Sequence, residues 1–506
     1  MKALRNGFFV FCLLLVTLGL PAVSVGQVPP PPTLTLEAIN TLSGPLYYPS
    51  ITKFLGSNPF PPPLPVSDES SSGGGVGTSS SQFGALYTNR VTLDDTADDV
   101  KPTIMTLTVG TTDYTAIGYI KLVTENNTKI YRNYVATTQT GLGQWIYSEM
   151  PRPSDFVWSA DPVLHENPYA SGVAPERMYY TGVLYNSSCD VPPNAIAVWR
   201  SNDGGFTWDD GNPATDDPAI IERNDSSAFC VDKPDVEVSW YSGTRGYVFV
   251  SYVKVNISDP TQNEVRVALS TDGGVTFGTP VVVTSSHILG TQMLIHPFTG
   301  RVYVVWSDFA TKEIRMSFSD DNGQTWTAPE TAASGEFVVP VQAFLNANVR
   351  ALTIPHARLN HIDNKICVVW HEWESSAREH TDIFYTAKSS SGWQIKKKIT
   401  ATTINDQFQP AVDFDDNGDL MVFYYDRSAD SSNILYEERW ARLDSSGNLL
   451  ESGQIADSFQ TDPRTYTNSF IGDYQDNWYW PYNDVWGKRF HGVFSGLRDI
   501  YAAAVR

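Results

Sequence analysis

From about residue 83 to the C-terminus, short hydrophobic runs alternate with turn-forming residues. The runs are rich in aromatic and β-branched side chains, and Gly, Asn, Asp and Pro separate them. The most apolar runs are VYVVW at 302–306, ICVVW at 366–370 and LMVFYY at 420–425. Because the runs have the composition of strands and no convincing helical period is present, we predict an all-β protein.

The pattern Ser-x-Asp-x-Gly-x-Thr-aromatic occurs at 201–208, 270–277 and 319–326, each time after a short alternating strand. We interpret it as a hairpin in which the Asp binds the turn amides, the Gly takes a positive φ and the aromatic ring packs on the neighbouring layer. Three such copies indicate a repeat architecture. We expect the defining residues to form turns and not to be catalytic: Ser201, Asp203, Gly205, Trp208, Ser270, Asp272, Gly274, Phe277, Ser319, Asp321, Gly323 and Trp326.

Seven units of roughly 50 to 70 residues each can be counted, which is within reach of propeller-blade periods. They begin near residues 98, 158, 231, 287, 348, 405 and 468. Four antiparallel strands per unit, repeated about an axis, form a β-propeller of four-stranded blades. The seventh unit lacks an outer strand, so we predict that residues 83–93 supply it and close the ring. Six blades would result if the first unit were an appendage, and a parallel β-helix is the alternative architecture.

The N-terminal part has a different composition. Residues 1–26 contain Lys2 and Arg5, an apolar run at 8–20 and a small-residue end, which together predict a cleaved signal peptide. Residues 27–82 are rich in Pro, Ser and Gly and predict a tether, so the propeller is assigned to 83–506. We therefore expect a secreted, extracellular or periplasmic monomer without a membrane span.

The net charge and the cysteines limit which partners and which covalent bonds the chain can have. The net charge of −21 argues against nucleic acid as a partner, because phosphate contacts need clustered Lys and Arg. Cys189 and Cys230 flank the first clear repeat and could form a disulfide, which the sequence alone leaves open, and Cys367 reads as a buried thiol. No zinc-ligand spacing is present, so neither a metal nor a cofactor is expected.

The three hairpin repeats resemble the Asp-box, or BNR, repeats of the sialidase superfamily, and the resemblance extends from about residue 98 to the end. The C-terminal third is also similar to a bacterial type of secreted sialidase-like protein, in the segments 406–410, 425–427, 470–474 and 498–501. The resemblance implies three arginines that bind a substrate carboxylate, a tyrosine nucleophile activated by a glutamate, and an aspartate acid/base. Two family features are missing. No Arg-Ile-Pro segment precedes the first repeat, and residues 494–497 replace the expected Trp-x-Asp.

Strand parity suggests where such a site would lie. Hairpins within blades share one face of a propeller, whereas inter-blade loops and connections between second and third strands share the other. On this inter-blade face the sequence places the candidate catalytic residues Arg350, Arg427, Arg498, Glu372, Tyr425, Tyr474, Asp161 and Asp232. The arginines would bind a carboxylate, Glu372 would pair with a tyrosine, and an aspartate would be the acid. The alternative to catalysis is, for each of these residues, a structural role as the cap of a turn or in an ion pair between blades.

Two functional hypotheses follow. The first is a secreted sialidase-like propeller that engages extracellular glycan or glycoconjugate, with sialidase-type exo-glycosidase activity on acidic sugars if it is an enzyme. The alternative is a non-catalytic binding or scaffold propeller at the cell surface or outside the cell. A lyase acting on acidic polysaccharide is a third option, because a propeller fold does not determine its chemistry.

Overall fold

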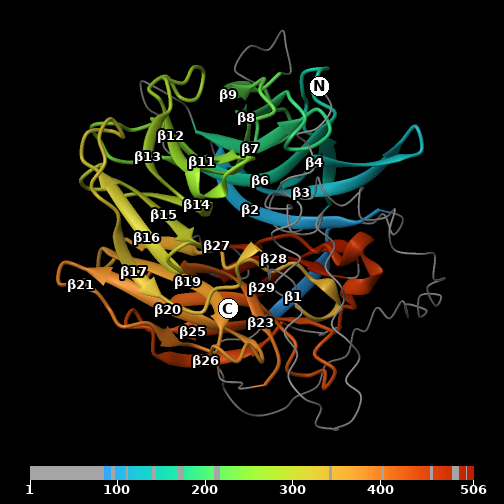
Figure 1. Cartoon of the computed structure of the whole chain (residues 1–506), viewed down its shortest axis with the longest axis vertical. Coiled ribbons are helices and arrows are strands. Elements are labelled where there is room, and N and C mark those ends of the chain that lie inside the picture. The colour runs from blue at the N-terminus through green and yellow to red at the C-terminus, as the bar shows by residue number, and fades with distance from the viewer. Residues whose placement is uncertain are drawn as a thin grey trace, which may run out of the picture. The chain divides into compact units, whose positions relative to one another are not determined.

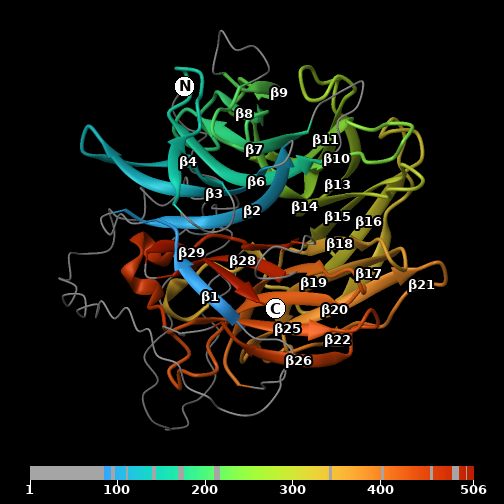
Figure 2. The same ribbon diagram turned by 180° about the vertical axis from the view of Figure 1, so that it is seen from behind.

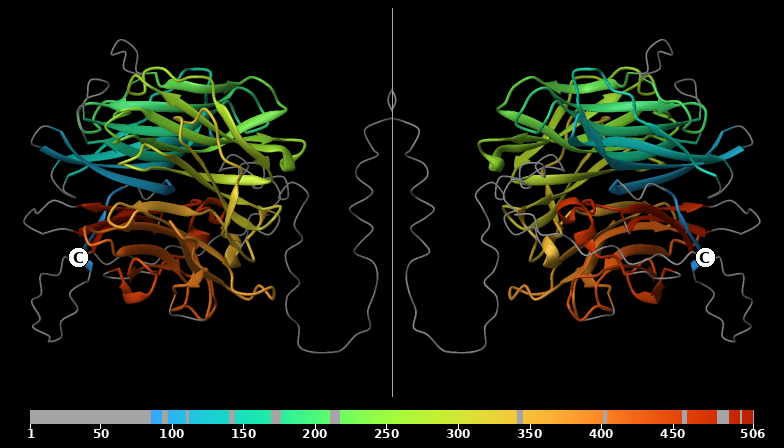
Figure 3. Two further views of the ribbon diagram at one scale, coloured as in Figure 1. Left: turned by 90° about the vertical axis from the view of Figure 1, so that its left-hand side faces the viewer. Right: turned by 90° about the vertical axis from the view of Figure 1, so that its right-hand side faces the viewer.

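The computed structural model describes residues 85–92, 97–109, 112–139, 144–168, 176–209, 217–340, 345–400, 404–455, 460–480, 489–496 and 498–505. These residues form seven antiparallel sheets around a common axis (Figures 1 and 2). The chain is therefore a seven-bladed β-propeller, which confirms the predicted fold class and the count of seven. Side views show the early blades, blue to green, on one half of the ring and the late blades, orange to red, on the other (Figure 3).

The first four blades are built from consecutive strands, ordered from the axis to the rim. Blade one contains β2 (Asp99–Val109), β3 (Thr112–Glu125), β4 (Thr128–Gln139) and β5 (Ile146–Glu149). Blade two contains β6 (Trp158–Asn167), β7 (Arg177–Tyr185), β8 (Asn194–Ser201) and β9 (Ala219–Asn224). Blade three contains β10 (Phe229–Val238), β11 (Val248–Asn256), β12 (Asn263–Ser270) and β13 (Val281–Ser286). Blade four contains β14 (Ile288–Ile295), β15 (Val302–Asp308), β16 (Glu313–Ser319) and β17 (Glu330–Ser334).

The later blades follow the same order. Blade five contains β18 (His356–Asn360), β19 (Lys365–Trp373), β20 (Thr381–Ser389), β21 (Gly392–Trp393) and β22 (Lys397–Lys398). Blade six contains β23 (Gln407–Phe414), β24 (Leu420–Asp426), β25 (Glu437–Leu443) and β26 (Leu449–Gln454). Blade seven contains β27 (Asp476–Trp480), β28 (Arg489–Gly496) and β29 (Asp499–Val505). Short 3-10 helices lie between strands: η2 (Pro260–Gln262), η4 (Asn346–Asn348), η5 (Pro463–Thr465) and η6 (Thr467–Ser469).

The ring closes through a strand from the start of the propeller. Strand β1 (Ala85–Arg90) pairs antiparallel with β29, with Ala85 opposite Val505 and Arg90 opposite Tyr501. It is therefore the outermost strand of blade seven, beside the red β29 in Figure 2. This pairing confirms the predicted role of residues 83–93. It joins the two ends of the propeller by backbone hydrogen bonds and completes a four-stranded blade seven.

Burial on both faces explains why the second strands of the blades are unbroken apolar runs in the sequence. Every residue of β7, β15 and β24 is buried, because these strands lie inside a blade whose two faces both pack on neighbouring blades. The largest fully buried side chains include Trp199, Trp306 and Trp370. No helix among the described residues is long and apolar enough to cross a membrane.

The hairpin repeats connect third to fourth strands and are held by their own side chains. In the first copy, Asp203 Oδ1 accepts hydrogen bonds from the backbone N–H groups of Phe206, at 3.1 Å, and Thr207, at 3.0 Å. Its Oδ2 accepts from Thr207 Oγ1 at 2.7 Å. The same pattern surrounds Asp272 and Asp321. These carboxylates are fully engaged within their turns, as expected for turn formers.

The cysteines lie where two blades meet. Cys189, in the β7–β8 connection, is disulfide-bonded to Cys230 at the start of β10, with 5.3 Å between the Cα atoms. The bond ties blade two to blade three. Cys367 is a buried free thiol in β19, and burial raises the pKa of that thiol to about 12.

Candidate functional site

The axis of the propeller is lined by backbone irregularities in the innermost strands. The pairing register shifts within β2, β6, β10, β14 and β23. At these bulges Lys101, Asp161, Lys233, Gly290 and Gln409 have φ values between 49° and 76°. Except for Gly290, each of them immediately precedes a proline. A bulge redirects a side chain, and non-glycine residues at positive φ persist only where the surroundings hold them. The X-Pro pairs of the sequence therefore mark mid-strand bulges at the axis.

A buried cluster of ions joins the bulges of different blades. Lys233 Nζ lies 2.7 Å from Asp473 Oδ2 and 3.2 Å from Asp161 Oδ2. Lys101 Nζ lies 2.9 Å from Asp473 Oδ2 and also contacts Asp161. Arg350 Nε donates to Asp473 Oδ1 at 2.7 Å. All five side chains are 4% exposed or less. They come from blades one, two, three and seven and from the loop that enters blade five, so the cluster links widely separated parts of the ring.

The two aspartates that were predicted as acid candidates lie next to each other in this cluster. Burial would raise the pKa of Asp161, but Lys101 and Lys233 hold it below its usual value. The pKa of Asp232 is raised to about 7, mainly by burial and also by the charge of Asp161. Tyr185 donates to Asp232 Oδ1 at 3.3 Å. Asp161 thus pairs with cations from blades one and three, whereas Asp232 is held by a hydrogen bond from Tyr185.

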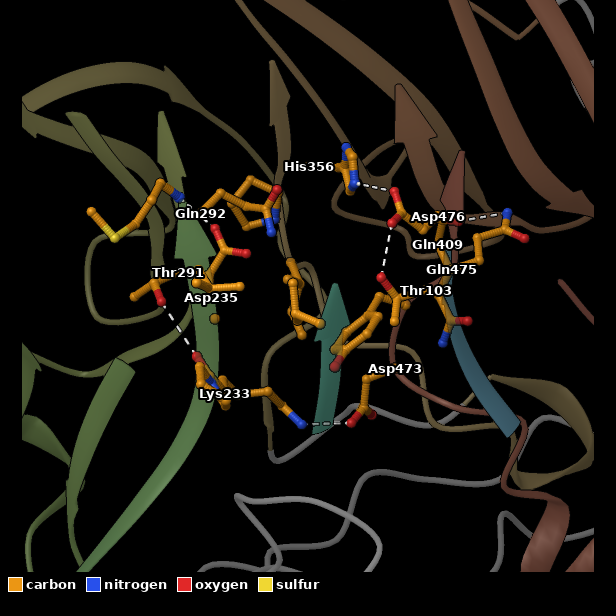
Figure 4. A pocket seen from close by; sticks show the side chains of 18 of the residues that line it. Thr103, Lys233, Asp235, Thr291, Gln292, His356, Gln409, Asp473, Gln475 and Asp476 are labelled. Atoms are coloured by element: carbon orange, nitrogen blue, oxygen red, sulfur yellow. Dashed lines mark hydrogen bonds and ion pairs between the residues drawn. The ribbon is translucent and has the colours of Figure 1, made fainter. Parts of the chain in front are cut away.

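On one side of the cluster the axis widens into a small cavity, which we call the channel chamber. Its volume is about 60 Å³. Lys233, Gln409 and Asp473 lie on its floor (Figure 4). The other ionisable residues that line it are His165, Asp235, Glu237, His356, Arg358, His371, Tyr474 and Asp476. Each inner strand runs from the inter-blade face towards the hairpin that joins it to the second strand of its blade. Most of the residues that line the chamber come after the bulge of their strand. The chamber therefore lies on the hairpin side of the propeller and not on the expected inter-blade side.

Two carboxyl groups of the chamber have pKa values shifted in opposite directions. Asp235 is buried and accepts a hydrogen bond from Met293 N at 2.6 Å, yet burial and the neighbouring Glu237 raise its pKa to about 7. For Asp476, burial would raise the pKa, but His356 and Arg358 lower it below the usual value. Arg358 Nη2 lies 3.3 Å from Asp476 Oδ1. Figure 4 shows Asp235 and Asp476 on opposite sides of the chamber.

Further contacts hold the walls of the chamber. Thr103 Oγ1 donates to Asp476 Oδ2 at 3.0 Å. His165 Nε2 lies 3.2 Å from Glu237 Oε2, and although burial would lower the pKa of His165, Glu237 raises it to about 9. His165 therefore carries a proton at neutral pH and forms an ion pair with Glu237. The chamber alternates carboxylates with cations from different blades.

The sequence interpretation did not select the chamber residues, although a signal for them was present. The third residue after the proline in or beside the inner strand is ionisable in four blades: His165, Glu237, Arg358 and Asp413. Of these, His165, Glu237 and Arg358 line the chamber. Positions of the same parity on inner strands point to the axis together. The extra residue in the bulge reverses which side chains of the strand face the axis after the proline. Counting alternate residues from the start of the strand therefore does not find these positions.

The three predicted arginines do not share a carboxylate. Arg350 binds Asp473, as described above. Arg427 is fully buried, its Nη1 lies 3.2 Å from Asp406 Oδ2, and its Nη2 donates to the backbone oxygen of Asn346 at 3.1 Å. Arg498 Nε lies 2.5 Å from Asp98 Oδ1. Each guanidinium thus neutralises a different carboxylate of the chain itself.

The predicted glutamate–tyrosine pair is likewise not assembled in the described residues. Glu372 Oε2 accepts from Trp370 Nε1 at 2.9 Å, and Glu372 also binds Lys396. Tyr425 OH accepts from Ser495 N at 2.9 Å in the core. Tyr474 OH donates to Pro162 O at 3.0 Å, and its ring lies 4.6 Å from Lys101 Nζ. Burial raises the pKa of both tyrosines well above the usual value.

Comparisons with known proteins concern the fold. No family model and no curated protein matches the chain. Among solved structures, Hadza microbial sialidase Hz136 is 11% identical with a TM-score of 0.45, and the match covers 80% of this chain and 65% of that one. The leech intramolecular trans-sialidase is 13% identical with a TM-score of 0.43, covering 76% and 71%.

A Penicillium chrysogenum α-L-arabinanase is 11% identical with a TM-score of 0.43, covering 74% of this chain and all of that one. At such identities, and with TM-scores below 0.5, these likenesses transfer no residue role and no activity to this chain.

Proposed function

We propose that this chain acts on glycans outside the cell and hydrolyses a glycosidic bond in the channel chamber. The observation that carries the proposal is the pair of carboxyl groups, Asp235 and Asp476, whose pKa values are displaced in opposite directions within one cavity. Glycosidases need one protonated and one ionised carboxyl group on either side of the scissile bond, and opposed shifts of pKa identify such pairs.

The two residues have distinct roles in this proposal. Asp235 is the general acid: its Oδ2 is held by Met293 N, so the proton on the other oxygen passes to the leaving oxygen as the glycosidic bond breaks. Asp476 is the ionised carboxylate that faces the sugar as base or nucleophile. Thr103 and Arg358 hold its two oxygens and fix its orientation.

We expect acidic sugars to be poorer substrates of this chain than neutral ones. Sialidase-type chemistry, the finer hypothesis from the sequence, requires Arg350, Arg427 and Arg498 to converge on a substrate carboxylate. Each of these arginines already binds a carboxylate of the chain, and release of a buried partner costs several kcal/mol, on the order of 3 to 5. We therefore expect neutral glycosides to be the better substrates.

A binding or scaffold propeller is the second candidate, and the size of the chamber favours it. A volume of about 60 Å³ holds roughly four to six water molecules. Ligand pockets are usually several times larger, roughly 300 to 1,000 Å³. Catalysis in the chamber therefore requires its mouth to open for the terminal sugar, whereas a scaffold function does not.

Turnover of a panel of fluorogenic glycosides tests these alternatives. The panel contains neutral pyranosides, an arabinofuranoside and a sialoside, and it is applied to the chain and to Asp235→Asn and Asp476→Asn. We expect turnover of a neutral glycoside and a loss of roughly 100-fold or more in both variants. Asp320→Asn is the matched control, since Asp320 forms an exposed pair with Arg301 far from the axis.

The other outcomes contradict the proposal in different ways. Sialoside turnover that survives both variants but is lost in Arg427→Lys would support the sialidase-type site. If no member of the panel is hydrolysed while a glycan array shows binding, the scaffold function is correct.

A further inference from the structure

Three side chains of the types that ligate metals lie at the end of β19 and the start of β20, on the inter-blade face of blade five. Glu374, His380 and Asp382 each present one ligand atom, and these atoms lie within 4.8 Å of one another. The strand pairing explains the convergence. Glu374 N donates to His380 O at 3.0 Å, so these two residues face each other across the ladder, and Asp382 follows His380 by two positions on the same face.

The distances within the group match the edges of a tetrahedron of ligands. His380 Nε2 lies 2.9 Å from Glu374 Oε2 and 3.6 Å from Asp382 Oδ2. Zinc bonds to His nitrogen and carboxylate oxygen are about 2.0 to 2.2 Å, so two ligand atoms of a tetrahedral ion are about 3.4 Å apart. The two measured edges lie on either side of that value.

The two inner ligand atoms are buried and contact charged groups of the same cluster. His380 Nε2 lies 2.9 Å from Glu374 Oε2, and Asp382 Oδ2 lies 2.8 Å from Lys398 Nζ. Asp382 has no exposed surface, and its other oxygen, Oδ1, accepts from Thr400 Oγ1 at 3.0 Å. That second bond orients the carboxylate in the way that outer partners orient metal ligands.

One cation of the chain already reaches the group. Lys398 Nζ lies 2.8 Å from Asp382 Oδ2 and 3.0 Å from Glu374 Oε1. Lys398 extends from the short outer strand β22 and keeps part of its side chain in solvent, so it can turn outward. An ammonium group that occupies the same carboxylates competes with a metal ion for them.

We propose that Glu374, His380 and Asp382 bind a divalent transition-metal ion of the Zn²⁺ type, with a fourth position open to water. One imidazole and two carboxylates form a ligand set that suits Zn²⁺ better than Ca²⁺ or Mg²⁺, which prefer oxygen ligands alone. The site is on the opposite face from the channel chamber and does not depend on the proposed glycosidase function.

Binding of Zn²⁺ alone to the whole, chelator-treated chain tests the site. Calorimetry and elemental analysis should give one ion per chain, and the Co²⁺-loaded protein should show the intense visible bands of tetrahedral cobalt. His380→Ala should weaken binding at least 10-fold and abolish the cobalt bands. Lys398→Met should tighten binding, because it removes the competing ammonium group.

A matched control separates ligand loss from general damage. His361→Ala removes a histidine from the β18–β19 hairpin of the same blade and should leave zinc affinity unchanged. If His380→Ala destabilises the chain, the Lys398→Met result still tests the site. The proposal is wrong if the chain binds no zinc, if His380→Ala binds as tightly as the parent, or if Lys398→Met leaves affinity unchanged.

Discussion

Replacement of Asp473 by Asn tests whether the axial ion cluster holds the blades together. Asp473 is completely buried, and Lys101, Lys233 and Arg350 contact its two oxygens. The substitution preserves the shape of the side chain but removes the charge. The three buried cations then face Asp161 and the partly protonated Asp232 as their remaining acidic partners in the cluster.

The structure indicates the size of the effect. Loss of one partner from a buried ion pair costs about 3 to 5 kcal/mol, because the remaining charges stay buried without compensation. Arg301 and Asp320 provide the comparison, since they form an ion pair of 2.6 Å at the surface. An exposed pair contributes about 0 to 1 kcal/mol. We therefore expect Asp473→Asn to lower the free energy of unfolding by about 3 kcal/mol more than Asp320→Asn does.

Urea unfolding followed by tryptophan fluorescence measures this difference. The pKa of Asp473 is held far below the usual 3.8. The contribution of its charge to the free energy of unfolding is therefore fully present above pH 3.8 and is lost only on strong acidification. The comparison is therefore made at neutral pH. Adding Lys233→Met to Asp473→Asn should recover part of the loss, because it removes one of the uncompensated charges.

Two results would refute the reasoning. The cluster does not stabilise the ring if Asp473→Asn unfolds within 1 kcal/mol of the parent, a margin well below the loss of about 3 kcal/mol or more expected for a buried pair. Additive effects of Lys233→Met and Asp473→Asn would mean that the two charges are not coupled.

The remaining predictions concern pH and the disulfide. Turnover requires Asp235 to be protonated and Asp476 to be ionised. The rate should therefore fall tenfold per pH unit above about pH 7 and stay level on mild acidification. A rate that rises through pH 8 would contradict the assignment of Asp235 as the acid. Replacing both Cys189 and Cys230 by Ser should lower the free energy of unfolding by about 4 kcal/mol, the chain-entropy value for a sequence separation of 41, as measured by urea unfolding of oxidised protein. If the double Ser variant matches the parent, the bond does not constrain the unfolded chain.

Much of the fold was predictable because its determinants are local. The hairpin at 201–208 is specified by side chains that bind backbone groups within four residues, as for Asp203 and Thr207. Unbroken apolar runs such as 302–306 identified second strands, because a strand buried on both faces needs no polar positions. The missing outer strand of the last unit led to β1, since a propeller blade has four strands and the last unit supplies three.

The candidate site was predictable only in part. Asp161, Asp232 and Tyr474 were predicted as catalytic residues on the inter-blade face. In the structure Asp161 pairs with Lys101 and Lys233, Asp232 accepts from Tyr185, and the Tyr474 ring packs on Lys101. The arginines were expected to converge because their blades are consecutive, yet each lies at a different depth and meets a different carboxylate, as Arg427 meets Asp406. Strand parity gives the face of a loop, but it does not give the partner of a long side chain.

Short-range information thus decided the strands, the turns and their repetition, because these depend on side chains acting on neighbouring backbone. Closure of the ring pairs residues as far apart as Ala85 and Val505, and the sequence indicated it only through the missing strand of the last unit. The channel chamber depended on tertiary structure. Its members Thr103, Asp235, Arg358 and Asp476 come from four different blades, and only the ring brings them to one cavity. Bulges at positive φ rotate the inner strands at the axis, and burial there shifts the pKa values that determine the chemistry. Both effects exist only once all seven blades surround the axis.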